Sequence, residues 1–595
     1  MIVAMRKVYI VARGRDRERL IEALAGLGVV HLQPVDRARA VADDDTVAAI
    51  DRCGRAIQVL RNTRPAGRPV EMAPLAAAEE VLRIQRESVE RAGRLSNLHR
   101  QLEQLAPWGD VRLAEFEELR RAGIEPQFFA VPRTKVGEIQ AECVQALGPW
   151  PGKRTLVAVI HRAGEVAMPE GSEAVALPSR DRPGILAEAG EVDAALKADA
   201  QKLAGLAHLA GALEAERARL QEKATWTIAS RSALDDEHLS ALKGWVPADQ
   251  AGGLAAGLTA HGVEAAAQVL EPEPGDEPPT LIKYPWWARP MEGLFKILGT
   301  VPGYGEFDVS AMFMIFLPIF SAILISDAGY GLVYLLVPIV FYRQFKAAGA
   351  ADLAQLIIIV GVLALAWGLA TCSLFGFNIT AWFGLSRALV AVDINKENME
   401  MLMVISITIG AIHLSLAHLW RAARAFPGLT FLSEVGWALV LWGVYGFLRM
   451  LLLGDPFSFS AVPYYPYLLI IGGALVIVFA APSRNPFKRI GLGLAGSLLP
   501  AIGTFGDTAS YLRLMAIGLA GSALAVAFND MARQLPWYMT IPVLLVAHAL
   551  NVALTVVALL AHGVRLNMLE FSNNLGMQWS GYAYEPFSRK RGQEN

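Results

Sequence analysis

The sequence has few cysteines, and their spacing excludes several kinds of site. Its 595 residues include three, Cys53, Cys143 and Cys372, which lie far apart and form no C-x-x-C pair. A disulfide framework and a zinc site of the usual spacing are therefore excluded. We expect buried thiols at these positions, and no metal or other cofactor.

Charge is also scarce, and most of it lies in the first half of the chain. Charged residues make up 18% of the sequence and apolar residues 54%, with a mean hydropathy of +0.37. Residues 1–300 carry most of the charges, whereas from about residue 305 long apolar runs follow one another. We therefore predict a soluble domain over residues 1–300 and a transmembrane domain over residues 301–595.

The N-terminus lacks the uninterrupted apolar run of a secretory signal. Because Arg6, Lys7, Arg13 and Arg15 break up the only candidate, no cleavable signal is predicted and the soluble domain is expected in the cytoplasm. A phosphate-binding loop is also lacking, since residues 151–154 have an arginine where serine or threonine must reach the metal. We expect no nucleotide site in this chain.

Apolar patterning predicts an α+β fold for the soluble domain, with two small globular ends. Residues 7–14 alternate like a strand, and residues 17–35 continue as an amphipathic helix and a second strand. Residues 126–133 and 154–162 are predicted strands of the second end, and residues 238–247 return the chain to the first.

Two helical arms are predicted to join these ends. In the first, apolar residues recur at steps of three and four from Val81, with Ser88 and Arg91 in two core positions. In the second, over residues 192–220, Asp199 occupies a core position among heptad-spaced leucines. Two such runs on either side of a globular end predict an antiparallel coiled-coil hairpin, which suits a rigid strut.

The apolar half predicts an α-helical membrane domain of about eight transmembrane helices, the last two long and tilted. A single helix over residues 307–342 would reach about 54 Å, against a hydrocarbon core of about 30 Å. Asp327 and its neighbouring glycines suit a turn near the middle, so we predict two spans that meet there. The other six are predicted over residues 353–375, 400–422, 431–452, 464–481, 504–533 and 538–571, with residues 487–503 as a helical or re-entrant entry.

The distribution of basic residues favours this topology. With the soluble domain in the cytoplasm, the cytoplasmic loops carry basic clusters and the outward loops carry few basic residues. A single span over residues 307–342 would invert the loops up to residue 490 and put most basic residues outside. The cytoplasmic clusters are Arg343 and Lys346, Arg421 and Arg424, Arg484, Lys488 and Arg489, and Arg589, Lys590 and Arg591.

Two arginines, Arg513 and Arg565, lie inside the last two predicted spans. A guanidinium keeps its proton, and burying it in hydrocarbon costs at least about 2.5 kcal/mol, so both are candidate functional residues. Facing polar ridges on these helices could hold water and relay protons, or could only join the helices by hydrogen bonds. The ridges comprise Thr504, Asp507, Ser510 and Arg513, and His548, Asn551, Thr555, His562 and Arg565.

Three further ionisable residues are weaker candidates for lining an aqueous path. His413 and His418 lie in one predicted span, and Glu434 lies at the start of the next. Each is near enough to a span end for ordinary packing or interfacial solvation to be the alternative. Both explanations stay open for each residue.

Several segments resemble the membrane-embedded stator subunit of rotary V-type and A-type ATPases, called subunit a or subunit I. Residues 507–520, DTASYLRLMAIGLA, resemble the motif of its penultimate helix, and residues 562–571, HGVRLNMLEF, resemble that of its last helix. Residues 316–335 are similar to its first membrane motif, and residues 277–310 to its linker. The similarity follows the same order over essentially the whole chain.

The resemblance implies a mechanism. In that family the subunit presses two ion half-channels against a rotating ring of proteolipid subunits, each with one carboxylate at mid-membrane. Arg513 would hold the passing carboxylate ionised and separate the half-channels, and Arg565 would support it. The cytoplasmic half-channel would include Thr504, Asp507 and His562, and the outer one Asp327, His413 and Glu434.

The resemblance also implies partners: the proteolipid ring, peripheral-stalk subunits on the cytoplasmic domain, the central-stalk and catalytic subunits, and the lipid membrane, with no nucleic acid. One departure is Gly521, where eukaryotic members often have a histidine. The ion, proton or sodium, and the direction, ATP synthesis or hydrolysis, stay open. The alternatives are a secondary transporter, against which the sequence has no internal repeat, and a membrane scaffold whose arginines only pack.

Overall fold

The computed structural model describes residues 1–588 except 36–39, 67–68, 162–165, 237, 381–394, 461, 482 and 484. These residues form two compact units. One comprises Met1–Ile10, Leu27–His31 and Gly244–Phe587, and the other Val11–Gly26 and Leu32–Lys243 with the residues from Ser588. The predicted boundary at residue 300 separates a cytoplasmic from a membrane environment and stays a prediction.

The first globular end is built on one β-sheet. Its strands follow the order β2-β8-β1-β9, with β7 paired to β8. The predicted strand at residues 7–14 and the helix after residue 17 are confirmed, and the stretch predicted to return the chain to this end contains strand β8. The elements are β1 (Met5–Arg13), α1 (Arg17–Leu27), β2 (His31–Gln33), β7 (Leu234–Asp235), β8 (Leu239–Pro247), α7 (Ala248–Ala251), α8 (Leu254–Ala260) and β9 (Ala265–Leu270).

A buried lysine lies within β1. Lys7 is 5% exposed, and its Nζ lies 3.0 Å from both carboxylate oxygens of Asp276. The hydrogen bond to Asp276 raises the pKa of Lys7. A buried charge of this kind requires such a partner.

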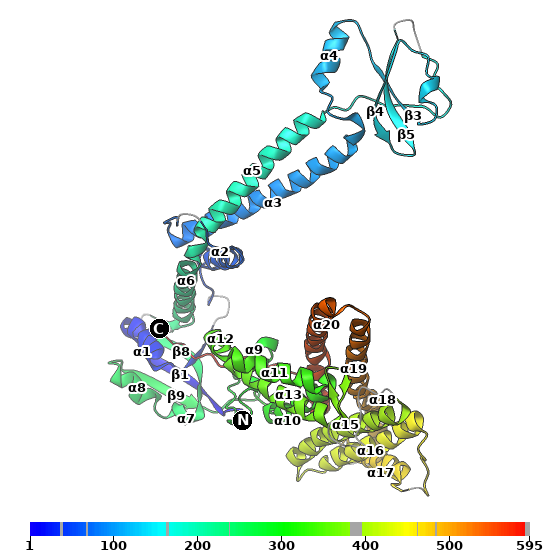
Figure 1. Cartoon of the computed structure of the whole chain (residues 1–595). Helices are drawn as coiled ribbons and strands as arrows, with labels where there is room; N and C mark the ends of the chain where they lie inside the picture. The colour runs from blue at the N-terminus through cyan, green and yellow to red at the C-terminus, as the bar shows by residue number, and fades with distance from the viewer. Residues whose placement is uncertain are drawn as a thin grey trace. The chain divides into compact units, whose positions relative to one another are not determined.

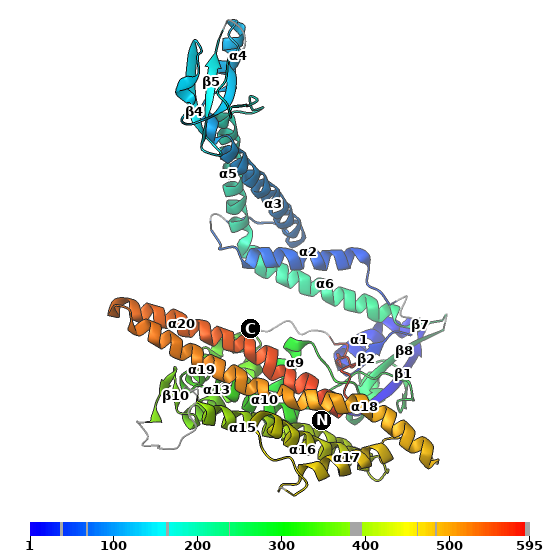
Figure 2. The ribbon, with the colours of Figure 1, turned by 90° about the vertical axis from the view of Figure 1, so that its right-hand side faces the viewer.

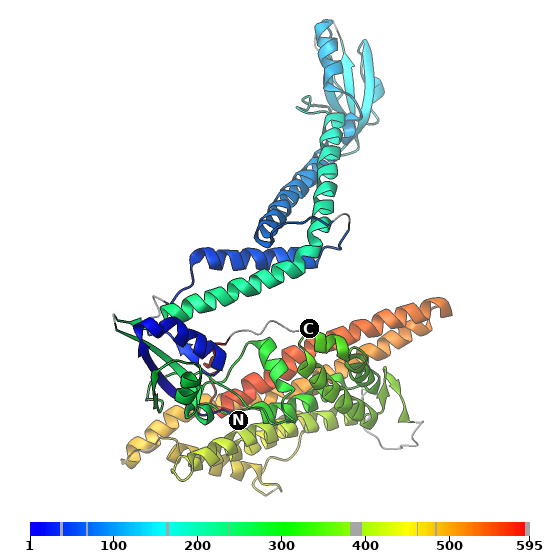
Figure 3. The ribbon, with the colours of Figure 1, turned by 90° about the vertical axis from the view of Figure 1, so that its left-hand side faces the viewer.

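The arm consists of four helices, α2 (Asp44–Arg61), α3 (Pro74–Gln104), α5 (Arg182–Leu206) and α6 (Ala210–Arg231). Helix α3 packs along α5, and α2 packs along α6 (Figures 1 and 3). A short 3₁₀ turn, Ala207–Leu209, separates α5 from α6, which the heptad pattern did not predict. Helix α2 was also missed.

The α3–α5 pair is antiparallel, as predicted. Arg94 of α3 pairs with Glu188 of α5, whereas Arg91, one turn earlier in α3, pairs with Asp199 further along α5. Apolar contacts of Leu98 with Ile185 and Ala189 continue the same register. Supercoiling of this pair stays a prediction.

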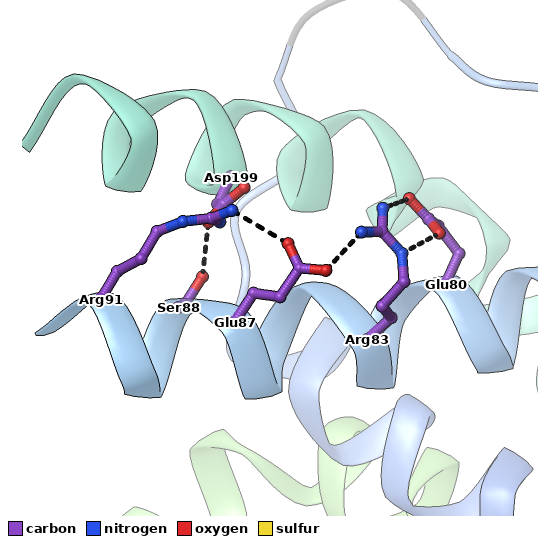
Figure 4. A network of polar contacts seen from close by, with 6 residues as sticks. All are labelled: Glu80, Arg83, Glu87, Ser88, Arg91 and Asp199. Carbon is purple, nitrogen blue, oxygen red and sulfur yellow. Dashed lines mark hydrogen bonds and ion pairs between the residues drawn. The ribbon is translucent and has the colours of Figure 1, made fainter. Parts of the chain in front are cut away.

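Polar residues occupy the predicted core positions of the arm and bind one another there. Asp199 is 4% exposed and accepts hydrogen bonds from Ser88, at 3.2 Å, and from Arg91. Figure 4 shows this network continuing through Glu87 to Arg83 and Glu80 along α3. The three polar core positions therefore compensate one another across the helix pair.

The second globular end lies between α3 and α5 in the chain. Its sheet has the order β4-β5-β3-β6, and the aromatic rings of Trp108 and Phe128 pack edge to face at 4.9 Å in its core. The two predicted strands are confirmed, and β4 was missed. The elements are α4 (Leu113–Arg121), β3 (Gln127–Pro132), β4 (Cys143–Trp150), β5 (Arg154–Ile160) and β6 (Glu173–Ala174).

Helices occur at all eight predicted membrane positions. Among the described residues, five helices are long and apolar enough to cross a membrane: Ala351–Ala370, Lys396–Ala425, Phe431–Leu453, Pro486–Arg533 and Trp537–Leu575. Three apolar helices are shorter, Ser310–Ile325, Ala328–Val340 and Tyr465–Phe479. A multi-pass membrane protein fits these helices, and the count of eight spans stays a prediction.

The helices of this half are α9 (Met291–Leu298), α10 (Ser310–Ile325), α11 (Ala328–Val340), α12 (Tyr342–Ala347), α13 (Ala351–Ala370), α15 (Lys396–Ala425), α16 (Phe431–Leu453), α17 (Tyr465–Phe479), α18 (Pro486–Ser510), α19 (Leu512–Arg533), α20 (Trp537–Ala558) and α21 (Ser572–Leu575). Residues 487–503, predicted as a helical or re-entrant entry, are helical and belong to α18. Of the predicted cytoplasmic basic residues, Arg484, Arg589, Lys590 and Arg591 lie outside the described residues.

Candidate functional site

Arg513 lies in the first turn of α19, just after the junction with α18. Tyr511 ends one helix and begins the other. The Tyr511 side chain is fully buried, and its hydroxyl lies 2.8 Å from Nδ1 of His413. This anchor fixes the backbone beside Arg513, whose side chain is 25% exposed.

Arg565 lies between two π-helical segments that follow α20. The segments are Leu559–Gly563 and Leu566–Phe571, and single π turns within α-helices are frequent at functional sites. The Arg565 side chain is 53% exposed. Helices α19 and α20 lie side by side (Figure 2) and pack against each other, so both arginines lie on neighbouring helices, as predicted.

Glu570 joins the two arginines, and the sequence analysis gave it no role. Its Oε1 lies 3.5 Å from Nε of Arg565 and 3.7 Å from a terminal nitrogen of Arg513. The same oxygen accepts a hydrogen bond of 2.8 Å from Ser510, and Arg513 donates to Ser510 at 3.0 Å. We call Ser510, Arg513, Arg565 and Glu570 the arginine cluster.

The π turn explains why Glu570 was missed. Residues five positions apart lie about 140° apart around a regular α-helix, at about 100° per residue. In a π-helix the backbone bonds run from i to i+5, so residues five apart lie near one another on successive turns. Leu566–Phe571 is such a segment, and it brings Glu570 beside Arg565.

A second group of polar side chains connects to this cluster through Asn574. The Asn574 amide donates to Asp507 at 2.7 Å and to the backbone carbonyl of Glu570 at 2.7 Å. Its oxygen lies 3.2 Å from Nε2 of His418, whose Nδ1 lies 2.9 Å from Glu434. Arg421 completes the group, 2.9 Å from Glu434. We call Asp507, His418, Arg421, Glu434 and Asn574 the Asn574 network.

A separate polar cluster lies in the middle of α20, before the π segments that flank Arg565. The Tyr330 hydroxyl contacts Nδ1 of His548 at 2.8 Å and accepts a hydrogen bond of 2.9 Å from Asn551. Nε2 of His548 lies 3.2 Å from Oδ1 of Asn529. Asn551 also donates to the carbonyl of Gly521 at 3.0 Å. We call Tyr330, Asn529, His548 and Asn551 the His548 cluster.

The predicted ridge on the last span is therefore divided. Its His548 and Asn551 belong to one cluster and its Arg565 to another, while Thr555 bonds back to the carbonyl of Asn551 at 2.8 Å. His562 lies in the first π segment and has a buried Nδ1 without a hydrogen-bond partner among the described residues.

The ridge on the seventh span is divided in a similar way. Asp507, Ser510 and Arg513 join the polar groups described above. The Thr504 hydroxyl bonds to the carbonyl of Pro500 at 2.9 Å within its own helix, as serine and threonine commonly do in helices.

Asp327 caps α11 as the predicted turn required, and its carboxylate is saturated. It is fully buried and accepts hydrogen bonds from the backbone N–H groups of Gly329, Tyr330, Phe375 and Gly376. The Ser373 hydroxyl donates a fifth bond. Five donors stabilise the carboxylate in place and connect α11 to the hairpin of β10 (Ser373–Leu374) and β11 (Phe377–Asn378).

His413 is enclosed by aromatic rings. It is fully buried and stacks on Phe571 with ring centroids 4.4 Å apart, with Phe316 at 4.1 Å on another side. This surrounding fits the packing explanation that the sequence left open. Within the described part of the chain, no group of three or more His, Cys, Asp or Glu side chains is arranged to hold a metal ion.

Comparisons with known proteins agree on one family. The chain is 29% identical to the V-type ATP synthase subunit I 1 of Treponema pallidum over 99% of this chain and 100% of that protein. It is 27% identical to V-type ATP synthase subunit I of Borreliella burgdorferi, again over 99% and 100%. The A-type ATP synthase subunit I of Methanocaldococcus jannaschii is 24% identical over 59% of this chain and 55% of that protein.

Other comparisons add little. No protein-family model matches the chain. A crystal structure of the cytoplasmic N-terminal domain of subunit I, homolog of subunit a, of V-ATPase aligns at 17% identity over 44% of this chain and 99% of that one, with a TM-score of 0.18, too low to support an argument. The chain is thus a homologue of V-type ATP synthase subunit I proteins over nearly its full length, and of an A-type subunit I over part of its length.

Proposed function

We propose that this chain is the membrane-embedded stator subunit of a rotary V-type or A-type ATPase. It forms two ion half-channels against a proteolipid ring and couples ion translocation to ATP hydrolysis or synthesis. Peripheral-stalk subunits bind its cytoplasmic domain, and nucleotide is handled by other subunits. Full-length homology to subunit I proteins supports membership of such a complex.

The observation that carries the mechanism is the arginine cluster. Arg513 and Arg565 lie on adjacent apolar helices, and their side chains are partly exposed, at 25% and 53%. Charges in apolar helices are costly and mark ion pathways. A ring carboxylate that passes the exposed side of these groups would be held ionised by them, which would block direct flow between the half-channels.

The two further polar groups suit the two half-channels. With basic residues on the cytoplasmic side, the Asn574 network leads from Arg421, at the cytoplasmic end of α15, to Asp507 and the arginine cluster. We therefore assign Glu434 to the cytoplasmic path together with Asp507, because His418 and Asn574 connect them. This replaces the sequence-based division of the two carboxylates between opposite paths.

The His548 cluster suits the outer half-channel, because it lies toward the opposite ends of α19 and α20. Its Asn551 borders Gly521, where a side-chain Cβ would meet nothing within 4 Å. His548 and Asn551 supply polar groups beside the position at which eukaryotic relatives often have a histidine. Asp327 and His413 then serve as structural supports of the channel walls, because their polar groups are bonded or enclosed.

The test is ATP-driven ion pumping by the purified, reconstituted complex. Arg513→Ala is expected to abolish pumping, while Arg533→Ala, an exposed arginine on the same helix, leaves it unchanged. Assembly is checked by co-purification of the other subunits. Undiminished pumping by Arg513→Ala in an assembled complex would refute the proposed mechanism.

A further inference from the structure

Glu570 is a buried carboxylate that the proposed mechanism does not use. It is 5% exposed and lies on the π segment that follows Arg565. Both arginines contact the same oxygen, Oε1. The second oxygen, Oε2, is buried and has no hydrogen-bond partner among the described residues.

The distances indicate a loose ion pair rather than tight charge-assisted hydrogen bonds. Such bonds between guanidinium and carboxylate are typically about 2.7–2.9 Å long, whereas Glu570 lies 3.5 Å from Arg565 and 3.7 Å from Arg513. The short contact is the one from Ser510, at 2.8 Å. Glu570 is thus held by Ser510 while it attracts both guanidinium groups.

The need for this carboxylate follows from the cost of the arginines. Removing one partner of a buried pair leaves an uncompensated charge, which is more costly than the pair itself. A ring carboxylate can compensate Arg513 only while it stands opposite. When no ring carboxylate stands opposite, Glu570 is the carboxylate that compensates the charge of Arg513 among the described residues, at 3.7 Å.

We propose that Glu570 is the resident counter-ion of Arg513 and Arg565. An arriving ring carboxylate displaces Glu570 from the two guanidinium groups, and Glu570 pairs with them again when that carboxylate leaves. No bond is made or broken in this exchange, and no proton moves to or from Glu570. Competition by Glu570 keeps the arginines from holding a ring carboxylate too tightly for rotation. Glu570 is a positioning residue, and this inference rests on the proposed function.

The first test is Glu570→Gln in the reconstituted complex. This variant keeps the size of the side chain and removes its charge, so the arginines lose their competitor and release the ring carboxylate slowly. ATP hydrolysis and ion pumping are expected to fall together by about tenfold or more, with an unchanged number of ions moved per ATP. A packing defect would instead uncouple hydrolysis from pumping.

The second test moves the charge. Ser510 lies next to Glu570 on the facing helix, so Ser510→Asp combined with Glu570→Ser returns a carboxylate to the same place. This double variant is expected to recover pumping to within about threefold of the unmodified complex. Asp455→Asn serves as the matched control, because it removes the carboxylate of another arginine pair, 2.6 Å from Arg449, away from the cluster.

Two outcomes would overturn the inference. Pumping by Glu570→Gln at the unmodified rate would do so, and so would a Glu570→Gln complex that assembles and is slow but that the moved carboxylate does not rescue. Arg513→Ala separates this from failure of the proposed function. If Arg513→Ala stops pumping while Glu570→Gln is normal, the counter-ion role alone fails.

Discussion

The arm and the membrane half each contain a buried carboxylate with arginine partners, in different surroundings. Asp199 in the arm is 4% exposed and Glu570 is 5% exposed. Asp199 is bonded directly by Arg91 and Ser88, and the Arg91 side chain is 33% exposed. Glu570 has longer contacts to two arginines, and one of its oxygens has no hydrogen-bond partner in the part of the chain that the structure describes.

The direct hydrogen bonds of Asp199 are typical of a fixed contact, whereas the longer contacts of Glu570 are typical of an ion pair that can exchange its partner. In the arm, a buried polar pair opposes slippage of two helices past one another, since any other register would leave Asp199 uncompensated. In the membrane half, the unsaturated pair leaves both arginines free to accept a second carboxylate. The same residue types thus suit a rigid strut in one region and a moving contact in the other.

Replacing Arg513 in the membrane half and Arg91 in the arm by lysine tests this contrast most strongly. Arg513→Lys is expected to lower pumping by about a hundredfold, because lysine lacks the planar fork that reaches Ser510 and Glu570 and readily changes its pKa when buried. Arg91→Lys keeps a positive charge within reach of Asp199, at a side chain that is 33% exposed, and is expected to change the stability of the arm by less than about 1 kcal/mol. Equal tolerance at both positions would remove the distinction.

Removing the arm carboxylate should destabilise the α3–α5 pair. Asp199→Ala removes the buried carboxylate that accepts from Arg91 and Ser88 and leaves Arg91 paired with Glu87, with an expected loss of about 1–3 kcal/mol. Hydrogen exchange of α3 and α5 in the full chain measures the loss. Asp193→Ala is the control on the same helix, because its pair with Lys197 is largely exposed and should contribute little.

The serine hydroxyls allow a smaller comparison. Ser510→Ala removes the short hydrogen bond to Glu570, which is typically worth about 0.5–1.5 kcal/mol, so pumping is expected to fall several-fold. Ser88→Ala leaves the Arg91–Asp199 pair in place, and a stability change below about 1 kcal/mol is expected in hydrogen exchange. A loss of stability above about 1 kcal/mol in Ser88→Ala would indicate that the Arg91–Asp199 pair depends on the Ser88 hydroxyl.

The smallest expected effect is the pH dependence of the arm. Arg180 and Arg94 hold the pKa of Glu188 below its ordinary value of 4.5, and Arg83 does the same for Glu80. Because these pKa values are depressed on folding, the stabilisation is present above pH 4.5 and is lost as the pH falls through the folded-state pKa values. The protection factors of α3 and α5 against hydrogen exchange, which correct for the intrinsic pH dependence of the exchange rate, should therefore fall below that pH, and protection factors that rise there would contradict this assignment.

The sequence predicted the core residues of the arm, but not the 3₁₀ turn that separates α5 from α6. Ser88, Arg91 and Asp199 were assigned to core positions from heptad spacing, and the structure brings them together. The 3₁₀ turn at Ala207–Leu209 was missed, because the leucine spacing continues across it, although Gly205 and Gly211 lie on either side. Helix α2 was missed although its apolar residues Cys53, Ile57 and Leu60 pack in the same core.

In the membrane half, hydropathy predicted where helices occur, including the turn at Asp327. Helical-wheel reasoning was less successful in assigning faces. It placed His548 and Arg565 on one stripe, but the π segments change the angle between successive residues. It also gave no sign that Asn574 connects Asp507 to His418, since that contact joins residues from three separate segments.

Composition and order of segments by themselves determined that the chain has a charged half and an apolar half, and that Arg513 and Arg565 are costly charges on neighbouring helices. These follow from local hydropathy and from the price of a guanidinium in hydrocarbon. The tertiary structure decided that Glu570 faces both arginines and that Asp327 is saturated. Such pairings depend on a π turn and on contacts between distant segments, which regular helical periodicity cannot encode.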